Sequence, residues 1–260
     1  MQTAGVHSTA IVAGDVQLGS GVEIGPYSVI GADAVIGDAT VIGAHVVIAA
    51  RTTLGRRNRV FQFASLGEIP QDRKYDGQPT RTVIGDDNVI REYVTVHAGT
   101  AQDRGVTTIG NGNWLLAYTH IAHDCAVGNG TTFSNNAQLA GHVVIEDHAV
   151  LGGFVGVHQF CRVGAHAFIA AGSIVLQDVP PYVTAAGYPA KPHGTNNEGL
   201  RRRGFTPDDL VAIKRAYKTL YRSSLSFDEA RAQIAADAKT TAVLAPLAAF
   251  LETAGRGIVR

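Results

Sequence analysis

The stretch AYTHIAHDCAVG, residues 117–128, brings together side chains that can transfer protons or bind a metal ion. His120 and His123 lie three residues apart, and Asp124 directly follows the second histidine. An imidazole titrates near neutral pH, so it can act as a general base that a neighbouring carboxylate orients. The same residue types also bind zinc. Which chemistry applies depends on the backbone that carries these residues.

The strongest pattern in the chain is an aliphatic or other apolar residue at every sixth position. It holds over residues 6–66, returns over 84–96, and after a slip of one residue runs over 109–175. An α-helix repeats near 3.6 residues and cannot maintain this spacing. Units of one short strand and one turn, three to a coil, predict a parallel β-helix with the apolar residue inside.

The composition changes near residue 192, which predicts two domains. We expect a mainly β domain over residues 1–192, with loops inserted at 68–82 and 98–106, and an α-helical C-terminal domain over 193–260. Both loops interrupt the repeat and are rich in polar residues, Gly or Pro, and long loops on a rigid scaffold often carry function.

Helix-start signals support the C-terminal domain. Thr206 followed by Pro207 is typical of an N-cap with Pro at the first helical position, and Ser226 with Glu229 is a capping box. Helical stretches are expected at 208–222, 227–239 and 241–254. These helices are expected to cover the last coil, whose core and strand groups would otherwise be exposed.

Three units of six residues make a coil of eighteen, so residues eighteen apart are expected to stack about 4.8 Å apart. Asp124 then lies under His142, and His123 lies under Gly141 with Gln159 two coils above, while His158 is in the neighbouring column. The pattern predicts a base, an orienting carboxylate and a backbone N–H that could bind an oxyanion within one coil rise. Five other histidines are expected at the surface or at corners: His7, His45, His97, His148 and His166.

The sequence gives little support for a metal, a disulfide or any cofactor. Residues three apart on a strand point to opposite faces, so His120 and His123 are a poor chelate. Cys125 and Cys161 are two coils apart, about 9.6 Å, which is beyond disulfide reach. Both are expected in the core.

Charge and hydropathy exclude several classes of partner. The chain has 22 Lys and Arg against 22 Asp and Glu, so bulk electrostatic binding to nucleic acid or to an anionic membrane is not expected. No apolar run approaches the roughly 20 residues of a membrane span, and no signal peptide is recognisable. We therefore expect a soluble, cytoplasmic protein.

Linked motifs over essentially the whole chain resemble one family. They are FQFASLGEIPQDRKYDGQPTR, THIAHDCAVGN, NNAQLAGHV, GGFVGVHQFCRVGAHAFI, QDVPPYV and NNEGLRRRGF, and they resemble the UDP-N-acetylglucosamine O-acyltransferases that use acyl carrier protein. The resemblance implies a left-handed β-helix, a homotrimer, and the first step of lipid A biosynthesis. In that step a 3-hydroxyacyl chain passes from acyl carrier protein to the sugar 3-hydroxyl. It also implies that His123 is the general base, that Asp124 orients it and that the Gly141 N–H holds the oxyanion.

The resemblance further implies binding residues in three parts of the chain. These are Gln71, Asp72 and Lys74 in the first loop, His120, His142, His158 and Gln159 on the β-helix, and Asn196, Glu198, Arg202 and Arg203 after it. The position that measures acyl length matches Ala171, with Phe168 nearby. The axial rise from His123 to Ala171 is about 13 Å, which suits about ten to twelve carbons; the chain is expected to be shorter than in members with Gly at that position.

Other readings remain open. The stretch GYPAK, residues 187–191, resembles hexapeptide acetyltransferases, so a CoA-dependent acetyltransferase with a small acceptor is the main alternative. The related lipid A N-acyltransferases have an additional N-terminal domain, for which a repeat starting at Val6 leaves no room. A non-catalytic scaffold or a protein like the gamma-type carbonic anhydrases is a further alternative, although no two histidines here have the five-residue spacing of those metal sites.

Overall fold

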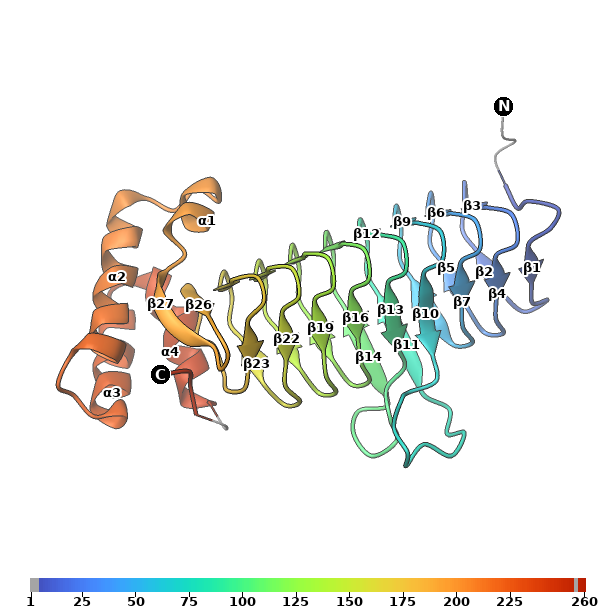
Figure 1. The fold of residues 1–260 in the computed structure, drawn as a ribbon. Coiled ribbons are helices and arrows are strands. Elements are labelled where there is room, and N and C mark those ends of the chain that lie inside the picture. Colours follow the sequence, from blue (N-terminus) through green and yellow to red (C-terminus); the bar gives the residue numbers. More distant parts are fainter. Residues whose placement is uncertain (1–4, 255–256) are drawn as a thin grey trace.

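The computed structural model describes residues 5–254 and 257–260. It shows a long, three-sided β-helix with a group of helices at its C-terminal end (Figure 1). The winding is left-handed, unlike the right-handed crossover of most parallel sheets. The predicted fold class is confirmed. Residues 1–4 and 255–256 of the predicted domains lie outside the described residues.

Three sheets form the sides of the β-helix. Sheet I contains β1 (Ile11–Val12), β4 (Val29–Ile30), β7 (Val47–Ile48), β10 (Ser65–Glu68), β13 (Thr95–His97), β16 (His120–Ile121), β19 (Gln138–Leu139), β22 (Gly156–Val157) and β25 (Ile174–Val175). Sheet II contains β2 (Gln17–Leu18), β5 (Val35–Ile36), β8 (Thr52–Leu54), β11 (Arg81–Ile84), β14 (Val106–Ile109), β17 (Ala126–Val127), β20 (Val144–Ile145) and β23 (Arg162–Val163). Sheet III contains β3 (Glu23–Ile24), β6 (Val41–Ile42), β9 (Arg59–Val60), β12 (Val89–Ile90), β15 (Trp114–Leu115), β18 (Thr132–Phe133), β21 (Val150–Leu151), β24 (Phe168–Ile169), β26 (Val183–Ala186) and β27 (Lys191–Thr195).

The apolar residue of each six-residue unit forms the core. It is the second residue of the typical two-residue strand, as in Ile42 and Ile48, which are 1% and 0% exposed. Side chains alternate along a strand, so the first residue of each strand faces outward. Val6 and Leu18 of the first coil are exposed, because no coil lies beneath them. Burial on one side of every strand therefore explains the six-residue period.

The corners use a left-handed backbone conformation at non-glycine residues. Asp124 (φ 59°), His142 (φ 61°), His148 (φ 60°) and His166 (φ 58°) are examples, spaced by multiples of six. This conformation is unfavourable for an L-residue, and the hydrogen bonds between coils stabilise it. Rings at one such corner stack in the order Tyr27, His45, Phe63, Tyr93 and Tyr118.

Coil length departs from eighteen residues where the two loops enter, and again in the last coil, where Phe168 pairs with Thr184 sixteen residues later. His120 pairs with Gln138, eighteen residues later, as the period predicts. Leu66 pairs with Val96 thirty residues later, and Val96 pairs with Ile121 twenty-five residues later. Both long coils contain a loop between a strand of sheet I and the next strand of sheet II, at the corner we call corner I–II. The loops hang side by side from this corner (Figure 1).

The C-terminal part begins with β27, which pairs antiparallel to β26, so the predicted boundary after residue 192 falls inside a strand. The helices are α1 (Asn197–Arg202), α2 (Pro207–Arg222), α3 (Phe227–Ala238), the 3₁₀ turn η1 (Ala242–Leu244) and α4 (Ala245–Glu252). Both predicted capping boxes, Thr206 with Asp209 and Ser226 with Glu229, are present. The sequence analysis did not predict α1, and the helix expected over 241–254 is divided between η1 and α4. Among the described residues, no helix combines the length and apolar character that crossing a bilayer requires.

A column of rings joins the last coils to the helices. The His166 ring stacks on Tyr182 at 5.8 Å and meets the edge of Phe205 at 5.0 Å. His148 lies on its other side, at 4.9 Å. The Nδ1 atom of His166 is buried and has no hydrogen-bond partner in the described part of the chain. Burial, with smaller contributions from nearby charges, lowers the pKa of His166 to about 4.

Inside the β-helix, a ladder of buried asparagines links successive coils. Asn88 donates from its backbone and side-chain nitrogens to Oδ1 of Asn58, at 2.9 and 3.0 Å, and from its side chain to the Gly110 carbonyl. Its own Oδ1 accepts from the Asn113 backbone N–H at 2.9 Å. A buried polar group is stable only when it is paired in this way.

We predict that Asn88→Ala lowers the free energy of unfolding by about 2–4 kcal/mol, because the buried Asn113 N–H and the Gly110 carbonyl of the next coil lose this partner and Asn58 loses one of its two donors. Asn129→Ala is the matched control, since Asn129 makes similar contacts to Asn111 and Asp147 at an exposed corner. Its effect is expected to be below about 1 kcal/mol. Urea unfolding of both variants at one protein concentration measures the difference, and equal losses would contradict the buried ladder as a source of stability.

We predict that His166→Phe makes the protein less sensitive to acid. In the unfolded chain His166 binds a proton below pH 6.5, whereas in the folded chain it does so only below about 4. The free energy of unfolding therefore falls as the pH is lowered from about 6.5 to about 4. His166 accounts for a loss of about 1–2 kcal/mol between pH 7 and pH 5. Phe preserves the ring stack, and Phe63 and Phe160 already occupy the same backbone conformation. Urea unfolding at pH 7 and pH 5 tests this, with the exposed His45→Phe as control; an unchanged acid loss in His166→Phe contradicts it.

Candidate active site

His123 and Asp124 form a hydrogen-bonded pair at corner I–II. Nδ1 of His123 lies 2.9 Å from Oδ2 of Asp124. The His123 side chain is 16% exposed and the Asp124 side chain is fully buried. The Asp124 carboxylate can only accept a hydrogen bond, so it pairs with a proton on Nδ1 of His123. The other ring nitrogen, Nε2, then carries the free lone pair and is the basic nitrogen.

The second loop holds Asp124 in place. Its carboxylate accepts hydrogen bonds from the Thr100 N–H at 2.9 Å and from the Thr100 hydroxyl at 2.7 Å. The Arg104 guanidinium donates to the Asp124 carbonyl at 2.7 Å, and the backbone N–H of Asp124 donates to the Thr107 hydroxyl at 2.8 Å. These bonds fix the carboxylate, and through it the orientation of the His123 ring.

Gly141 lies against the His123 ring, as the eighteen-residue spacing predicts. A methyl group added at Gly141 would come within 2.5 Å of Cε1 and 2.8 Å of Nε2 of His123. Glycine is therefore required at this position by the ring packed against it. Within the described residues, the N–H of Gly141 donates no hydrogen bond.

His142 covers another side of the same ring. It meets His123 edge to face, with ring centroids 5.0 Å apart and planes at 87°. Its own ring stacks on Phe160 at 4.4 Å, and its Nδ1 lies 2.7 Å from Oδ2 of Asp103. Two histidine–carboxylate pairs thus lie in adjacent coils of one corner.

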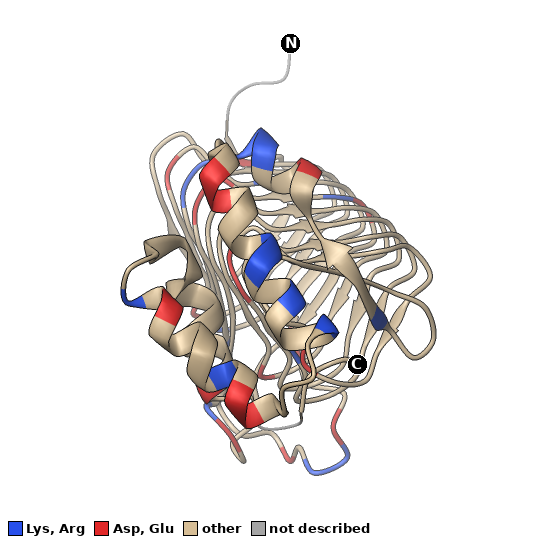
Figure 2. Ribbon diagram, turned by 90° about the vertical axis from the view of Figure 1, so that its left-hand side faces the viewer, with Lys and Arg blue, Asp and Glu red and all other residues tan. Residues whose placement is uncertain are grey.

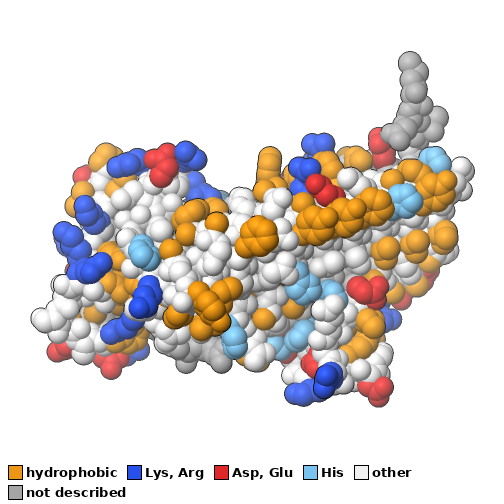
Figure 3. All heavy atoms as spheres, viewed as in Figure 1, with side chains coloured by type: hydrophobic (Ala, Val, Ile, Leu, Met, Phe, Trp, Pro, Cys, Tyr) orange, Lys and Arg blue, Asp and Glu red, His pale blue; other side chains and the backbone are white. Residues whose placement is uncertain are grey.

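The His123 ring borders a hollow of about 480 Å³ on sheet I. Gln71, His120, Gly141 and His158 also line it, so the structure brings together residues predicted from four separate motifs. The histidines (pale blue) gather above the two loops in Figure 3. Apolar residues continue the hollow toward the helices, including Val157, Ile174 and Leu176.

Two buried histidines form one wall of the hollow. His120 is paired through Nδ1 with the Thr95 hydroxyl at 2.8 Å and meets the His97 ring edge to face at 5.2 Å. Burial, aided by neighbouring His97 and His123, lowers the pKa of His120 to about 4. Burial also lowers the pKa of His97. Both imidazoles are therefore neutral near pH 7. The expectation that His97 is a surface or corner residue is wrong, because it is 7% exposed on β13 and faces the hollow.

Ligand atoms of His123, Asp124 and His142 lie within 4.8 Å of one another, a spacing that a metal ion could bridge. Two of these groups already form hydrogen bonds with carboxylates, at 2.9 and 2.7 Å. Asp124 Oδ2 also accepts from Thr100 at 2.7 Å, so its lone pairs point toward protein donors. The geometry is that of hydrogen-bonded acid–base pairs. The two cysteines are buried, and burial raises the pKa of Cys125 to about 12.

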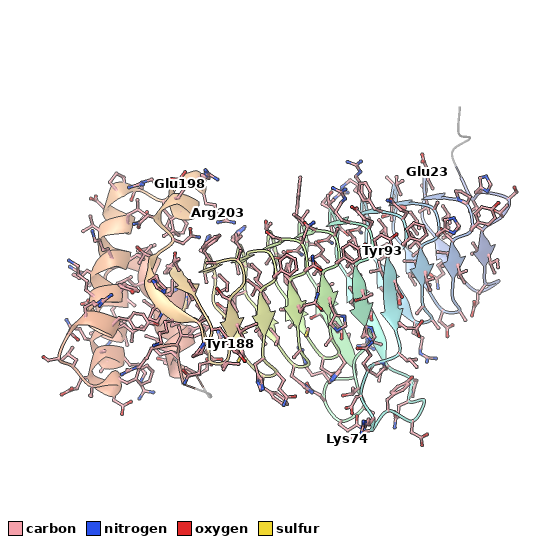
Figure 4. The ribbon with its side chains drawn as sticks, in the orientation of Figure 1. Glu23, Lys74, Tyr93, Tyr188, Glu198 and Arg203 are labelled. Carbon is pink, nitrogen blue, oxygen red and sulfur yellow. The ribbon has the colours of Figure 1, made fainter. Side chains whose placement is uncertain are left out.

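Other predicted residues lie near the hollow without lining it. Asp72 accepts from the Lys74 N–H at 3.0 Å, which shapes the tip of the first loop. The Gln102 side chain of the second loop reaches the Lys74 carbonyl at 3.5 Å. Gln159 is exposed at corner I–II, beside His158. The first loop therefore places Gln71 in the hollow and leaves the Lys74 side chain exposed (Figure 4).

A third group is remote from the hollow in a single chain. Glu198 and Arg203 of the α1 region lie at the opposite edge of the molecule from Lys74 (Figure 4). Arg202 and Glu198 form an exposed ion pair at 3.0 Å, and Asn196 caps α1 while donating to the His166 carbonyl at 3.0 Å.

The predicted acyl-length residues also lie outside the lining of the hollow. Ala171 is exposed at the corner between sheets III and I, and Phe168 lies on sheet III. The roles of these two residues remain predictions.

Sequence reasoning missed five residues at the site. The coil that contains the second loop is twenty-five residues long, so His97 lies in the coil before His120 and His123 and close to both. The next coil has eighteen residues, so Gln138 stacks on His120. Those signals were available once the loop length was known. Thr100, Asp103 and Arg104 belong to a loop without periodicity, so no spacing rule could have found their contacts.

Comparisons with known proteins agree with this geometry. The family model described as UDP N-acetylglucosamine O-acyltransferase, domain 2, matches residues 178–259, and the bacterial transferase hexapeptide model matches residues 107–141. The chain is 61% identical to acyl-[acyl-carrier-protein]–UDP-N-acetylglucosamine O-acyltransferase of Thiobacillus denitrificans, covering 99% of this chain and 100% of the relative. It is 56% identical to the protein of the same name from Herminiimonas arsenicoxydans, with 98% and 99% covered. The crystal structure of the Francisella novicida UDP-N-acetylglucosamine acyltransferase superposes with a TM-score of 0.97 at 46% identity, covering 98% of this chain and 94% of the other. The chain therefore belongs to the UDP-N-acetylglucosamine O-acyltransferase family.

Proposed function

We propose that this enzyme transfers a 3-hydroxyacyl chain from acyl carrier protein to the 3-hydroxyl of UDP-N-acetylglucosamine, which begins lipid A biosynthesis. The relatives named above, which match nearly the whole chain, are named acyl-[acyl-carrier-protein]–UDP-N-acetylglucosamine O-acyltransferases. The observation that carries the proposal is the His123–Asp124 pair, held at 2.9 Å, with Nε2 beside Gly141 at the edge of the hollow.

In the proposed mechanism His123 acts as general base. Its Nε2 takes the proton of the sugar hydroxyl while the oxygen attacks the thioester carbonyl carbon. Asp124 stabilises the imidazolium that results and keeps the ring oriented. The tetrahedral intermediate then collapses, the carbon–sulfur bond breaks, and the thiolate of the carrier protein receives the proton from His123. The ester product and the free carrier thiol account for all atoms.

Gly141 supplies the proposed oxyanion donor. Its N–H makes no hydrogen bond with another described residue and lies beside the ring of the base. A fixed donor at the developing negative charge lowers the barrier, because it needs no reorganisation during the reaction. The neutral imidazoles of His97 and His120 add no positive charge beside the imidazolium that forms on His123 during the reaction.

We further propose that the site is completed by a second copy of the chain in a homotrimer. The proposed nucleotide-binding residues Asn196, Glu198, Arg202 and Arg203 are remote from the hollow in one chain (Figure 4). One face of a β-helix also offers little concavity for a large substrate. A neighbouring copy would both deepen the hollow into a cleft and supply these residues.

Basic side chains on the helices suit an acidic carrier protein. Lys214, Arg215 and Lys218 of α2 and Arg201 of α1 are exposed, and Figure 2 shows the basic residues along α2 at the end of the molecule. A local patch of this kind provides electrostatic attraction that the neutral total charge does not. Location in the cytoplasm and the acyl-chain length remain predictions from the sequence.

The alternative of a CoA-dependent acetyltransferase is not favoured. Full-length relatives and structures carry the UDP-N-acetylglucosamine acyltransferase name. The GYPAK stretch that suggested it connects β26 to β27, and its Gly187 and Ala190 form backbone hydrogen bonds with Ile174. A non-catalytic scaffold is equally disfavoured by the hydrogen-bonded His123–Asp124 pair.

We predict that His123→Ala lowers kcat by about 10²–10⁴-fold, because the general base is lost. Mass spectrometry of the product formed from UDP-N-acetylglucosamine and mixed 3-hydroxyacyl carrier proteins measures the activity. His45→Ala, at an exposed corner remote from the hollow, is the control and is expected to retain full activity. If the enzyme instead transfers an acetyl group from acetyl-CoA, the proposed function is wrong. If His123→Ala remains fully active, the proposed mechanism is wrong.

We predict that Gly141→Ala inactivates the enzyme while leaving it folded. The added methyl group would overlap the His123 ring, whose carboxylate partner is fixed, so the ring must move out of position. A shift of the reacting atoms by about 1 Å lowers the rate by about 10²-fold. Gly14→Ala is the matched control, since a methyl group there meets nothing within 4 Å. Steady-state kinetics with circular dichroism measure both effects, and near-normal kcat in Gly141→Ala would refute the close packing.

A further inference from the structure

The second loop contacts the candidate site at two separate points. Thr100 and Arg104 hold Asp124, at 2.7 Å each, and this explains how the loop is anchored. Asp103 reaches further and pairs with Nδ1 of His142 at 2.7 Å. The proposed reaction uses neither Asp103 nor this second pair, so its presence needs a separate explanation.

The partners of Asp103 connect it to the base. His142 touches the His123 ring edge to face at 5.0 Å, and on its other side it stacks on Phe160 at 4.4 Å. The side chain of His142 is 19% exposed and that of Asp103 is 37% exposed. His142 therefore bounds the movement of His123 where the two rings meet, and Asp103 bounds the movement of His142.

We propose that Asp103 is a positioning residue that acts on His123 through His142. Its carboxylate accepts the Nδ1–H of His142, which selects one ring tautomer and one ring angle. The ring held in this way restricts the His123 imidazole, which also packs against Gly141. The base is then preorganised on two sides, by Asp124 at Nδ1 and by the pair Asp103–His142 against the ring.

Energetics favour a role in positioning over a role in folding. A partly exposed ion pair contributes little to stability, so Asp103 adds little to the fold. The loop also keeps its anchors at Thr100 and Arg104 when Asp103 is changed. Loss of the carboxylate is therefore expected to release the His142 ring and to leave the loop in place.

The inference rests on the proposed function for its kinetic test, and its spectroscopic test is independent of that function. Asp103→Asn is expected to lower kcat about three- to tenfold with the KM values for both substrates within about twofold, because the loss concerns the alignment of the base in the reacting complex. Asp33→Asn removes the same charge at an exposed corner of the β-helix and is expected to match the wild type.

A double-mutant cycle separates positioning from a local structural effect. His142→Asn keeps a residue type that tolerates the left-handed corner conformation. If Asp103 acts through His142, Asp103→Asn has no further effect on kcat in the His142→Asn background. Equal, additive losses in the two backgrounds, or a loss of kcat that follows a lowered thermal midpoint, would overturn the proposal.

Nitrogen NMR of the histidine rings gives the independent readout. The wild type is expected to show His142 with the proton on Nδ1, and Asp103→Asn to show a shifted tautomer signature with no change in the signals of His45. If the wild type forms no acylated sugar nucleotide, the proposed function fails while the NMR result still decides the pairing. If the wild type is active and Asp103→Asn matches Asp33→Asn in both kcat and spectrum, the inference alone fails.

Discussion

The coil length of eighteen residues, held by hydrogen bonds between successive turns of the chain, is the constraint on which the site depends. Each strand is only a few residues long and could not form a stable sheet alone, but every strand inside a sheet pairs with a neighbour on both sides. A residue at a corner therefore has a fixed neighbour in the next coil. His123 contacts Gly141 for this reason, and Asp124 precedes His142 in the same corner column.

The same constraint explains why both loops can serve one site. A loop that enters at a corner lengthens its own coil and leaves the pairing of the strands unchanged, as the thirty- and twenty-five-residue coils show. Both loops enter at corner I–II, in the two coils that precede the coil of His123. Irregular backbone is thereby placed beside a rigid ladder. The ladder supplies the base and the glycine, and the loops supply the hydrogen bonds that orient them, through Thr100 and Asp103.

The periodic part of this arrangement could be predicted from the sequence, and the aperiodic part could not. The six-residue period located the core, the corners and the stacking of His123 with Gly141, because one geometric rule governs every coil. It misplaced His97, since the length of the second loop had to be known before the coils could be aligned across it. The contacts of Thr100, Asp103 and Arg104 depend on a loop conformation that no period determines. The short α1 was missed because six residues that include Gly199 and successive arginines are equally typical of a turn.

The shape of a β-helix explains why the proposed nucleotide-binding residues lie far from the hollow in a single chain. Successive coils differ by a translation along one axis, so residues at corner I–II and residues of α1 at the end of the molecule are separated along that axis and lie at different edges (Figure 4). No bending of a rigid ladder can bring them together. Packing two copies side by side removes this separation, because the C-terminal end of one chain can lie beside the corner of the next. We therefore infer that the acceptor is bound between copies. Its reacting hydroxyl then meets His123 of one copy, and its diphosphate meets the basic residues of α1 on the other.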